Sequence, residues 1–205
     1  MNSELLDYIE REIVPRYEHF DKAHGTSHVR QVMEQSMTLA EHYDVDKAMV
    51  YTIAAYHDTG LCEGRERHHI TSGEILVADH ILQQHFTQEQ LFVMRDAVED
   101  HRASATSAPR TIYGRIIAEA DRCIDTETVI RRTIQFGLRH YPNINREGHF
   151  QRCKEHITEK YSETGYLKLW IPESDNARRL AELRAVAKDE QQFRALFERL
   201  FDEEA

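Results

Sequence analysis

The chain has 205 residues and a formal net charge of -10 at pH 7, with 36 acidic side chains against 26 Lys and Arg. Binding to a nucleic-acid backbone depends on neutralising phosphates, so this balance argues against a nucleic-acid polymer as the main partner, although local arginine clusters could hold small anions. The N-terminus lacks a basic region followed by an apolar core, and no apolar run reaches about 18 residues, so we expect a cytoplasmic protein without a membrane partner.

The three cysteines are odd in number, scattered and without CxxC spacing. This pattern disfavours a disulfide framework and a thiolate zinc site. We therefore expect Cys62, Cys123 and Cys153 to be free thiols.

The first two predicted helices carry potential ligands at their ends. One begins at Ser27, which can cap it, and runs to about Tyr43, so His28 stands at its start. The next begins at Asp46, another capping residue, and runs to His57. Two histidines are therefore expected at helix termini.

Two capping boxes predict the following helices. A Thr-x-x-Glu sequence predicts a helix over residues 73–84, with His69 just before it. A Thr-x-x-Gln sequence predicts a helix over residues 89–101, which ends on His101. Both boxes thus place a histidine at a helix terminus.

The remainder of the chain is also helical in pattern. A long segment from Thr111 to about His140 carries Asp121, a helix over residues 150–161 follows, and an amphipathic stretch covers residues 174–200. No strand alternation of useful length occurs. We expect an all-α fold in a single domain over residues 1–205, with a core at about 20–140 and a helical C-terminal lobe at about 141–205.

Three polar residues close the same kind of apolar helical stripe. His57, His101 and Asp121 each follow apolar residues at i, i+3 and i+4 and stand at i+7, which aims them at the core. Burying an ionised carboxylate without a partner costs on the order of several kcal/mol of folding free energy. A metal ion is a partner that all three residues can share. Imidazole and carboxylate without thiolate favour Mn, Fe, Co, Ni or Zn, with Mg possible. Alone, each could equally be a hydrogen-bonded core residue.

The position of the adjacent pair His57 and Asp58 along its helix decides whether both side chains can bind one ion. Neighbouring residues on a helix point about 100° apart, so both can reach one ion only where the helix is ending. The sequence Thr59-Gly60 supplies such an end. A carboxylate at this point could also bridge two ions.

The ordered series His28, His57-Asp58 and Asp121 resembles the H…HD…D signature of the HD-domain superfamily, over roughly residues 20 to 130. Members of this superfamily are helical metal-dependent phosphohydrolases. The resemblance implies an HD-type helical bundle in which these four residues bind one divalent metal ion.

Binuclear branches of that superfamily add two histidines between the HD pair and the last aspartate. Here His69 and His101 look like those two, which would give a site with two ions. His68 is an alternative ligand, but its spacing to Gly73 disfavours it.

A narrower resemblance concerns residues 119–122, Glu-Ala-Asp-Arg, which look like the D-A-D-R of a bacterial subgroup that includes nucleotide pyrophosphohydrolases. The first position holds Glu119 instead of Asp. The resemblance implies a nucleotide as the best candidate substrate.

Several charged residues are candidates for contact with a small phosphorylated substrate. Planar guanidinium groups suit phosphate oxygens, although solvated charge explains the exposed arginines equally well. The catalytic candidates are Asp58, Glu63, which could orient water, and Arg122; the substrate-binding candidates are Arg65, Arg67 and Lys160.

Three functions remain in competition. The first is hydrolysis of a small phosphate ester or anhydride by metal-activated water. The second is a di-iron oxygenase acting on a small organic substrate, because some HD-fold proteins with the same six ligands bind two irons. The third is a metal-stabilised binding domain without turnover. A homodimer through the C-terminal stretch is a further expectation.

Overall fold

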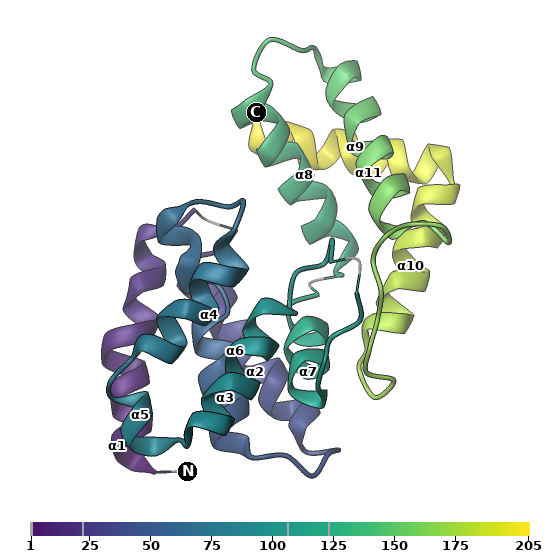
Figure 1. Cartoon of the computed structure of the whole chain (residues 1–205). Coiled ribbons are helices and arrows are strands. Elements are labelled where there is room, and N and C mark those ends of the chain that lie inside the picture. The colour runs from purple at the N-terminus through teal and green to yellow at the C-terminus, as the bar shows by residue number, and fades with distance from the viewer. Residues whose placement is uncertain (1, 22, 106, 123) are drawn as a thin grey trace. The chain divides into compact units, whose positions relative to one another are not determined.

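The structure is a computed structural model that describes every residue except 1, 22, 106 and 123 (Figure 1). The described residues form eleven α-helices and no β-strand, which confirms the all-α fold class. Among them, no helix is both long and apolar enough to cross a membrane. Cys62 is an exposed free thiol and Cys153 a buried one, whereas Cys123 lies outside the described residues.

The chain divides into two compact units, each described here by itself. The first comprises Met1–Arg122 and Trp170–Ser174, and the second comprises Cys123–Leu169 and Asp175–Ala205. The expectation of a single domain over residues 1–205, with a core at about 20–140 and a lobe at about 141–205, stays a prediction.

The first unit begins with a continuous helical segment whose winding changes twice. The α-helix α1 (Ser3–Tyr8) continues as the π-helical turn η1 (Ile9–Ile13) and then as the 3₁₀ helix η2 (Val14–His19). Ile9, Ile13 and Tyr17 are fully buried, so this segment contributes to the core of the unit.

The next two helices carry their potential ligands at the predicted ends, although the first is capped by Gly25, without a side-chain hydrogen bond, and not by Ser27. Helix α2 (Thr26–Ala40) carries His28 in its first turn, and α3 (Lys47–Tyr56) begins at Asp46, whose carboxylate accepts hydrogen bonds from two backbone N–H groups. Helix α3 ends at His57, and the 3₁₀ helix η3 (Thr59–Glu63) follows directly. The expected helix end at the His57-Asp58 pair is confirmed.

The predicted helix over residues 73–84 is wrong. Helix α4 (His68–Ala78) begins five residues earlier, with Thr71 buried inside it, and the separate short helix α5 (Leu82–His85) follows. Asp79 separates the two because its carboxylate accepts from the N–H groups of Ile81 and Leu82, as a helix cap does. Helix α6 (Gln88–Glu99) carries the predicted capping box.

The long pattern from residue 111 to 140 is two helices instead of one. Helix α7 (Ile112–Ala120) ends at Asp121, and α8 (Thr126–His140) begins at Asp125, whose carboxylate accepts from the backbone N–H of Thr128 at 2.8 Å. Asp121 thus lies at a helix end, as His57 does.

The second unit contains α8, α9 (Arg146–Tyr161), α10 (Asn176–Lys188) and α11 (Glu190–Glu204). Its core includes the Phe150 ring, whose centroid lies 5.3 Å from that of Phe193 and 5.2 Å from that of Phe197. The amphipathic C-terminal stretch is divided at Asp189, which caps α11.

A returning segment completes the first unit. Glu119 is fully buried, and its carboxylate accepts from the backbone N–H groups of Trp170, at 2.6 Å, and Ile171, and from the Ser174 hydroxyl. The residue that departs from the D-A-D-R pattern therefore anchors residues 170–174 to α7.

Candidate metal centre

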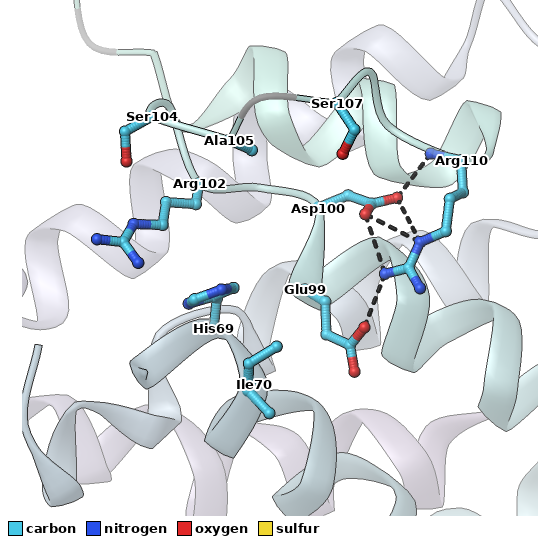
Figure 2. Close-up of a pocket in the computed structure, with 9 residues that line it drawn as sticks. All are labelled: His69, Ile70, Glu99, Asp100, Arg102, Ser104, Ala105, Ser107 and Arg110. Atoms are coloured by element: carbon cyan, nitrogen blue, oxygen red, sulfur yellow. Dashed lines mark hydrogen bonds and ion pairs between the residues drawn. The ribbon is translucent and has the colours of Figure 1, made fainter. Parts of the chain in front are cut away.

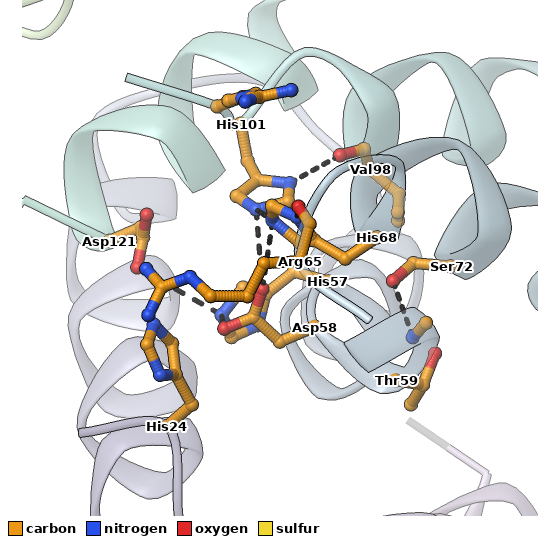
Figure 3. Close-up of polar contacts among 12 residues, drawn as sticks. His24, His57, Asp58, Thr59, Arg65, His68, Ser72, Val98, His101 and Asp121 are labelled. Carbon is orange, nitrogen blue, oxygen red and sulfur yellow. Dashed lines mark hydrogen bonds and ion pairs between the residues drawn. The ribbon is translucent and has the colours of Figure 1, made fainter. Parts of the chain in front are cut away.

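Six side chains of the first unit converge at one place, and all of them except His28 are labelled in Figure 3. They come from the start of α2, the end of α3, the start of α4 and the residues that follow α6 and α7. They are His28, His57, Asp58, His68, His101 and Asp121. In every case the residue lies at or next to a helix end, where a side chain can leave the helix surface and turn inward.

The first side of the cluster surrounds Oδ2 of Asp58. This oxygen lies 3.2 Å from Nε2 of His57 and 3.6 Å from Nε2 of His28. Oδ1 of Asp121 lies 3.2 Å from the same nitrogen of His28, and 3.9 Å from Nε2 of His57. The four residues of the ordered series are thus brought together around one point.

The second side surrounds the other oxygen of the same carboxylate. Oδ1 of Asp58 lies 3.4 Å from Nε2 of His68 and 3.4 Å from Nε2 of His101. The two imidazole nitrogens are 3.2 Å apart. Asp58 is therefore placed to share its carboxylate between two sets of ligand atoms.

Backbone carbonyl groups fix the orientation of three imidazoles. Nδ1 of His57 donates to the carbonyl of Ala54 at 2.8 Å, and Nδ1 of His68 donates to that of Arg65 at 2.8 Å. His101 makes the same contact to Val98. A carbonyl oxygen only accepts, so Nδ1 carries the proton and Nε2 of the neutral ring presents its lone pair to the cluster.

This donor set fits a metal cation. Nε2 of His68 and Nε2 of His101 face each other as lone pairs at 3.2 Å, an arrangement that is repulsive unless positive charge lies between them. Asp58 and the ring of His57 are almost entirely buried, which makes an uncompensated carboxylate costly. Imidazole nitrogen with carboxylate oxygen is the donor chemistry of divalent transition metals.

The pKa shifts show how strongly the two carboxylates favour positive charge nearby. Burial lowers the pKa of His28, but hydrogen bonds to Asp121 and Asp58 outweigh it and raise the pKa to about 9. Burial raises the pKa of Asp58, but the neighbouring imidazoles, with His57 first, hold it well below its ordinary value. Burial, followed by the repulsion that would arise if His68 and His101 were both protonated, lowers the pKa of His68 to about 4.

Tyr17 holds the backbone at the helix end that carries the His57-Asp58 pair. Its hydroxyl donates to the carbonyl of Ala55 at 2.9 Å and accepts from the backbone N–H of Asp58 at 3.1 Å. The ring is fully buried, and burial raises the pKa of the hydroxyl well above its ordinary value. The sequence analysis did not identify this residue, because its partners are backbone groups about 40 positions away.

Gly60 allows α4 to approach the same turn. Its N–H donates to the buried hydroxyl of Ser72 at 2.8 Å (Figure 3). A Cβ atom at this position would lie 2.5 Å from the backbone nitrogen of Ser72 and still closer to the carbonyl oxygen of His68. Only glycine fits at this position. Because it has no side chain, the start of α4 can pack close enough to bring His68 next to Asp58.

The placement of the two adjacent histidines corrects one prediction. His68 lies in the cluster, whereas His69, expected to be a ligand, faces a pocket beside it (Figure 2). Because α4 begins at His68, both residues are helical and point about 100° apart, so only one can face Asp58. The helix start predicted from sequence was five residues too late, which favoured His69 over His68, and α4 has no side-chain cap that could have indicated its true start.

Arg122 connects two parts of the cluster. It is buried, and its Nη1 donates to the carbonyl of His101 at 2.9 Å and lies 3.8 Å from Oδ2 of Asp121. Its guanidinium thus fixes the chain that follows α6 against the chain that follows α7. Its expected contact with phosphate stays a prediction.

The other predicted site residues lie outside the cluster. Glu63, Arg65 and Arg67 are exposed on the segment between α3 and α4, with Nη1 of Arg65 4.0 Å from Oδ2 of Asp21. Lys160 belongs to the second unit, where its Nζ lies 5.1 Å from the centroid of the Tyr161 ring. The roles expected for these four residues stay predictions.

Comparison with known proteins gives one match. The family model described as the HD domain matches residues 25–124, a range that contains all six side chains of the cluster. No curated protein and no solved structure matches the chain.

Proposed function

Because residues 25–124 of this chain belong to the HD-domain family, we propose that the protein is a metal-dependent phosphohydrolase that cleaves a small phosphate ester or anhydride, with nucleotides as its substrate class. HD domains are typically metal-dependent phosphohydrolases. The observation that carries the proposal is the position of Asp58, whose two oxygens face two separate sets of imidazole nitrogens.

The residues divide naturally into two ligand sets. His28, His57, Asp58 and Asp121 would hold one ion, and Asp58, His68 and His101 the other. Divalent metal ions lower the pKa of bound water and polarise phosphoryl oxygens. Mn, Fe, Co, Ni and Zn match these nitrogen and oxygen donors, and Mg is a weaker match.

The protein itself would supply orientation and exclusion of water. Backbone carbonyls hold the rings of His57, His68 and His101 in place before any substrate arrives. Burial of Asp58 keeps the local dielectric low, which strengthens the interactions of its charge. Arg65, exposed at the edge of the cluster in Figure 3, is the candidate for contact with phosphate oxygens.

The test combines metal analysis with a screen for released phosphate and pyrophosphate over nucleotides and simple phosphate esters. Mn, Co, Ni and Mg are added separately to the purified chain. We expect the release of phosphate or pyrophosphate to depend on added metal. In Asp58→Asn the release rate should fall by more than about 10–100-fold, which is the usual loss when a group that only supports a metal ligand is changed. Bound metal should be lost in the same variant.

The matched control is Asp44→Asn, which removes the same charge from an exposed position of the same unit. It should retain metal and release. Release that persists in Asp58→Asn would exclude the assignment. Two bound irons with substrate-dependent oxygen uptake and no phosphate release would instead identify the di-iron oxygenase, which would use the same six side chains.

A further inference from the structure

A second feature of the first unit lies directly beside the metal centre. It is an open pocket of about 590 Å³, within the range of pockets that hold small organic molecules. Two of its lining residues, His69 and Arg102, follow the cluster residues His68 and His101 in the chain. The pocket is therefore lined by the chain neighbours of two cluster residues, although no cluster residue itself lines it.

The two sides of the pocket differ in chemistry (Figure 2). His69 and Arg102 line one side, and the carboxylates of Glu99 and Asp100 with Arg110 line the other. Nη1 of Arg102 donates to the carbonyl of Glu66 at 2.9 Å, which holds the side chain while using only part of its five-donor capacity. This side can donate to an anionic group.

The opposite side offers acceptors. Oε2 of Glu99 accepts from Nη2 of Arg110 at 2.8 Å, whereas Oε1 lies 3.6 Å from the Nε of Arg95, beyond hydrogen-bond distance. That oxygen can accept from a hydroxyl group. The hydroxyls of Ser104 and Ser107, on the exposed loop above, can both donate and accept.

One polar atom at the pocket also lacks a partner. Nδ1 of His69 is buried and makes no hydrogen bond within the described part of the chain. A buried polar atom without a partner destabilises the folded state.

We propose that this pocket binds the hydroxylated organic part of the substrate, a sugar in chemical class, while the phosphoryl group lies at the metal centre. The inference rests on the proposed function and deepens it, because it assigns the sugar of a sugar phosphate, the class to which nucleotides belong, to a particular pocket. Arg102 lies where it can contact the phosphate-proximal end, and Glu99 and the two serines where they can contact sugar hydroxyls.

The test measures binding, so it does not depend on turnover. Adenosine 5′-thiomonophosphate, a slowly hydrolysed analogue, and inorganic thiophosphate are titrated calorimetrically into the metal-loaded full chain. We expect the nucleoside compound to bind at least tenfold more tightly than inorganic thiophosphate. Equal affinities would overturn the inference.

Two pairs of variants locate the effect. Ala105→Trp fills the pocket and should abolish the tenfold preference while leaving metal content unchanged. The control is Ala108→Trp, which changes an exposed residue of the same loop outside the pocket lining and should keep the preference. Arg102→Ala should weaken binding of the nucleoside compound, and Arg115→Ala, an exposed arginine on α7, should not. A preference that survives Ala105→Trp would place the sugar elsewhere and overturn the inference.

The outcomes separate this inference from the proposed function. A pocket-dependent preference without phosphate release from any compound would support the sugar site and remove the hydrolase. Phosphate release without a preference for the nucleoside compound would support the hydrolase and exclude the sugar site.

Discussion

The two sides of Asp58 are held in place by different means. On the first side, His28 and His57 occupy the start of α2 and the end of α3, and both are almost fully buried. On the second side, His68 is only partly buried and stands on α4, whose approach depends on Gly60. The first side is thus built from the ends of two core helices, whereas the second depends on how closely a third packs against them.

This difference predicts which ligand set a given structural change should affect. A change that shifts α4 should affect the second ligand set and leave the first largely intact.

The largest effect is expected from His68→Ala compared with His69→Ala. Loss of the His68 imidazole removes one of three ligands on the second side, so bound metal should fall from two ions to one per chain. His69→Ala, which changes the adjacent residue outside the cluster, should leave metal content unchanged. Elemental analysis of both variants measures the number of bound ions per chain. A loss of metal in His69→Ala alone would show that His69, as predicted from sequence, is the ligand instead of His68.

Gly60→Ala should act on the same side without removing a ligand. The added Cβ would overlap the backbone at His68 and Ser72, which should lower the free energy of unfolding by about 1–3 kcal/mol and weaken the second ion more than the first. Chemical denaturation and metal titration measure the two effects. Gly25→Ala, where the nearest atom to the new Cβ is 3.5 Å away, is the control. Equal weakening of both ions would contradict the separation.

Tyr17→Phe should act on both sides, because it loosens the backbone of Asp58, whose two oxygens face both ligand sets. The change leaves the carbonyl of Ala55 and the N–H of Asp58 without their buried partner, at a cost of about 1–3 kcal/mol in the free energy of unfolding. Because Asp58 is displaced but not lost, metal should bind more weakly at unchanged stoichiometry. Titration calorimetry at neutral pH measures this; unchanged affinity would show that the turn holds its shape without the hydroxyl.

The smallest effect concerns the far end of α4. The carboxylate of Asp79 accepts from the hydroxyls of Tyr8 and Tyr56, both at 2.6 Å, and ties α4 to α1 and α3. Despite burial, which raises it, these bonds and two backbone N–H groups lower the pKa of Asp79. The ionised form is thus favoured in the folded state, so its contribution is present above the unfolded pKa of about 3.9 and is lost as pH falls through the lower folded value.

Asp79→Asn should therefore be less stable than wild type by on the order of 1 kcal/mol at pH 6, with the difference shrinking below about pH 4. Urea denaturation of both proteins across this range provides the measurement. A difference that stays constant into the acid range would show that the charge of Asp79 contributes nothing.

The extent to which sequence predicts this site follows the same division. The start of α3 is marked by the Asp46 cap and its end by Thr59-Gly60, so the helix end at His57 and Asp58 could be predicted from sequence, whereas the start of α2 has no side-chain cap and His28 was inferred from the ordered series. The start of α4 has no side-chain cap. It is set by packing against Gly60, a tertiary contact, so the neighbouring residue His69 was chosen in place of His68.

Helix ends also explain the errors in the fold. Asp125 and Asp189 interrupt patterns whose apolar periodicity continues on both sides, so each pair of helices looked like one. An aspartate inside an amphipathic pattern can be a solvated residue or a cap, and only the backbone decides between them.

The burial of Glu119 has a consequence for how the chain can be divided. Its carboxylate receives donors from residues 170–174, about 50 positions further along and well beyond the stretch that matches the family. A fragment that ended near residue 124 would leave a charged group in an apolar interior without these donors. Such a fragment should fold poorly and be cleaved readily by proteases, because the boundary of the family match is not a boundary of the folded unit.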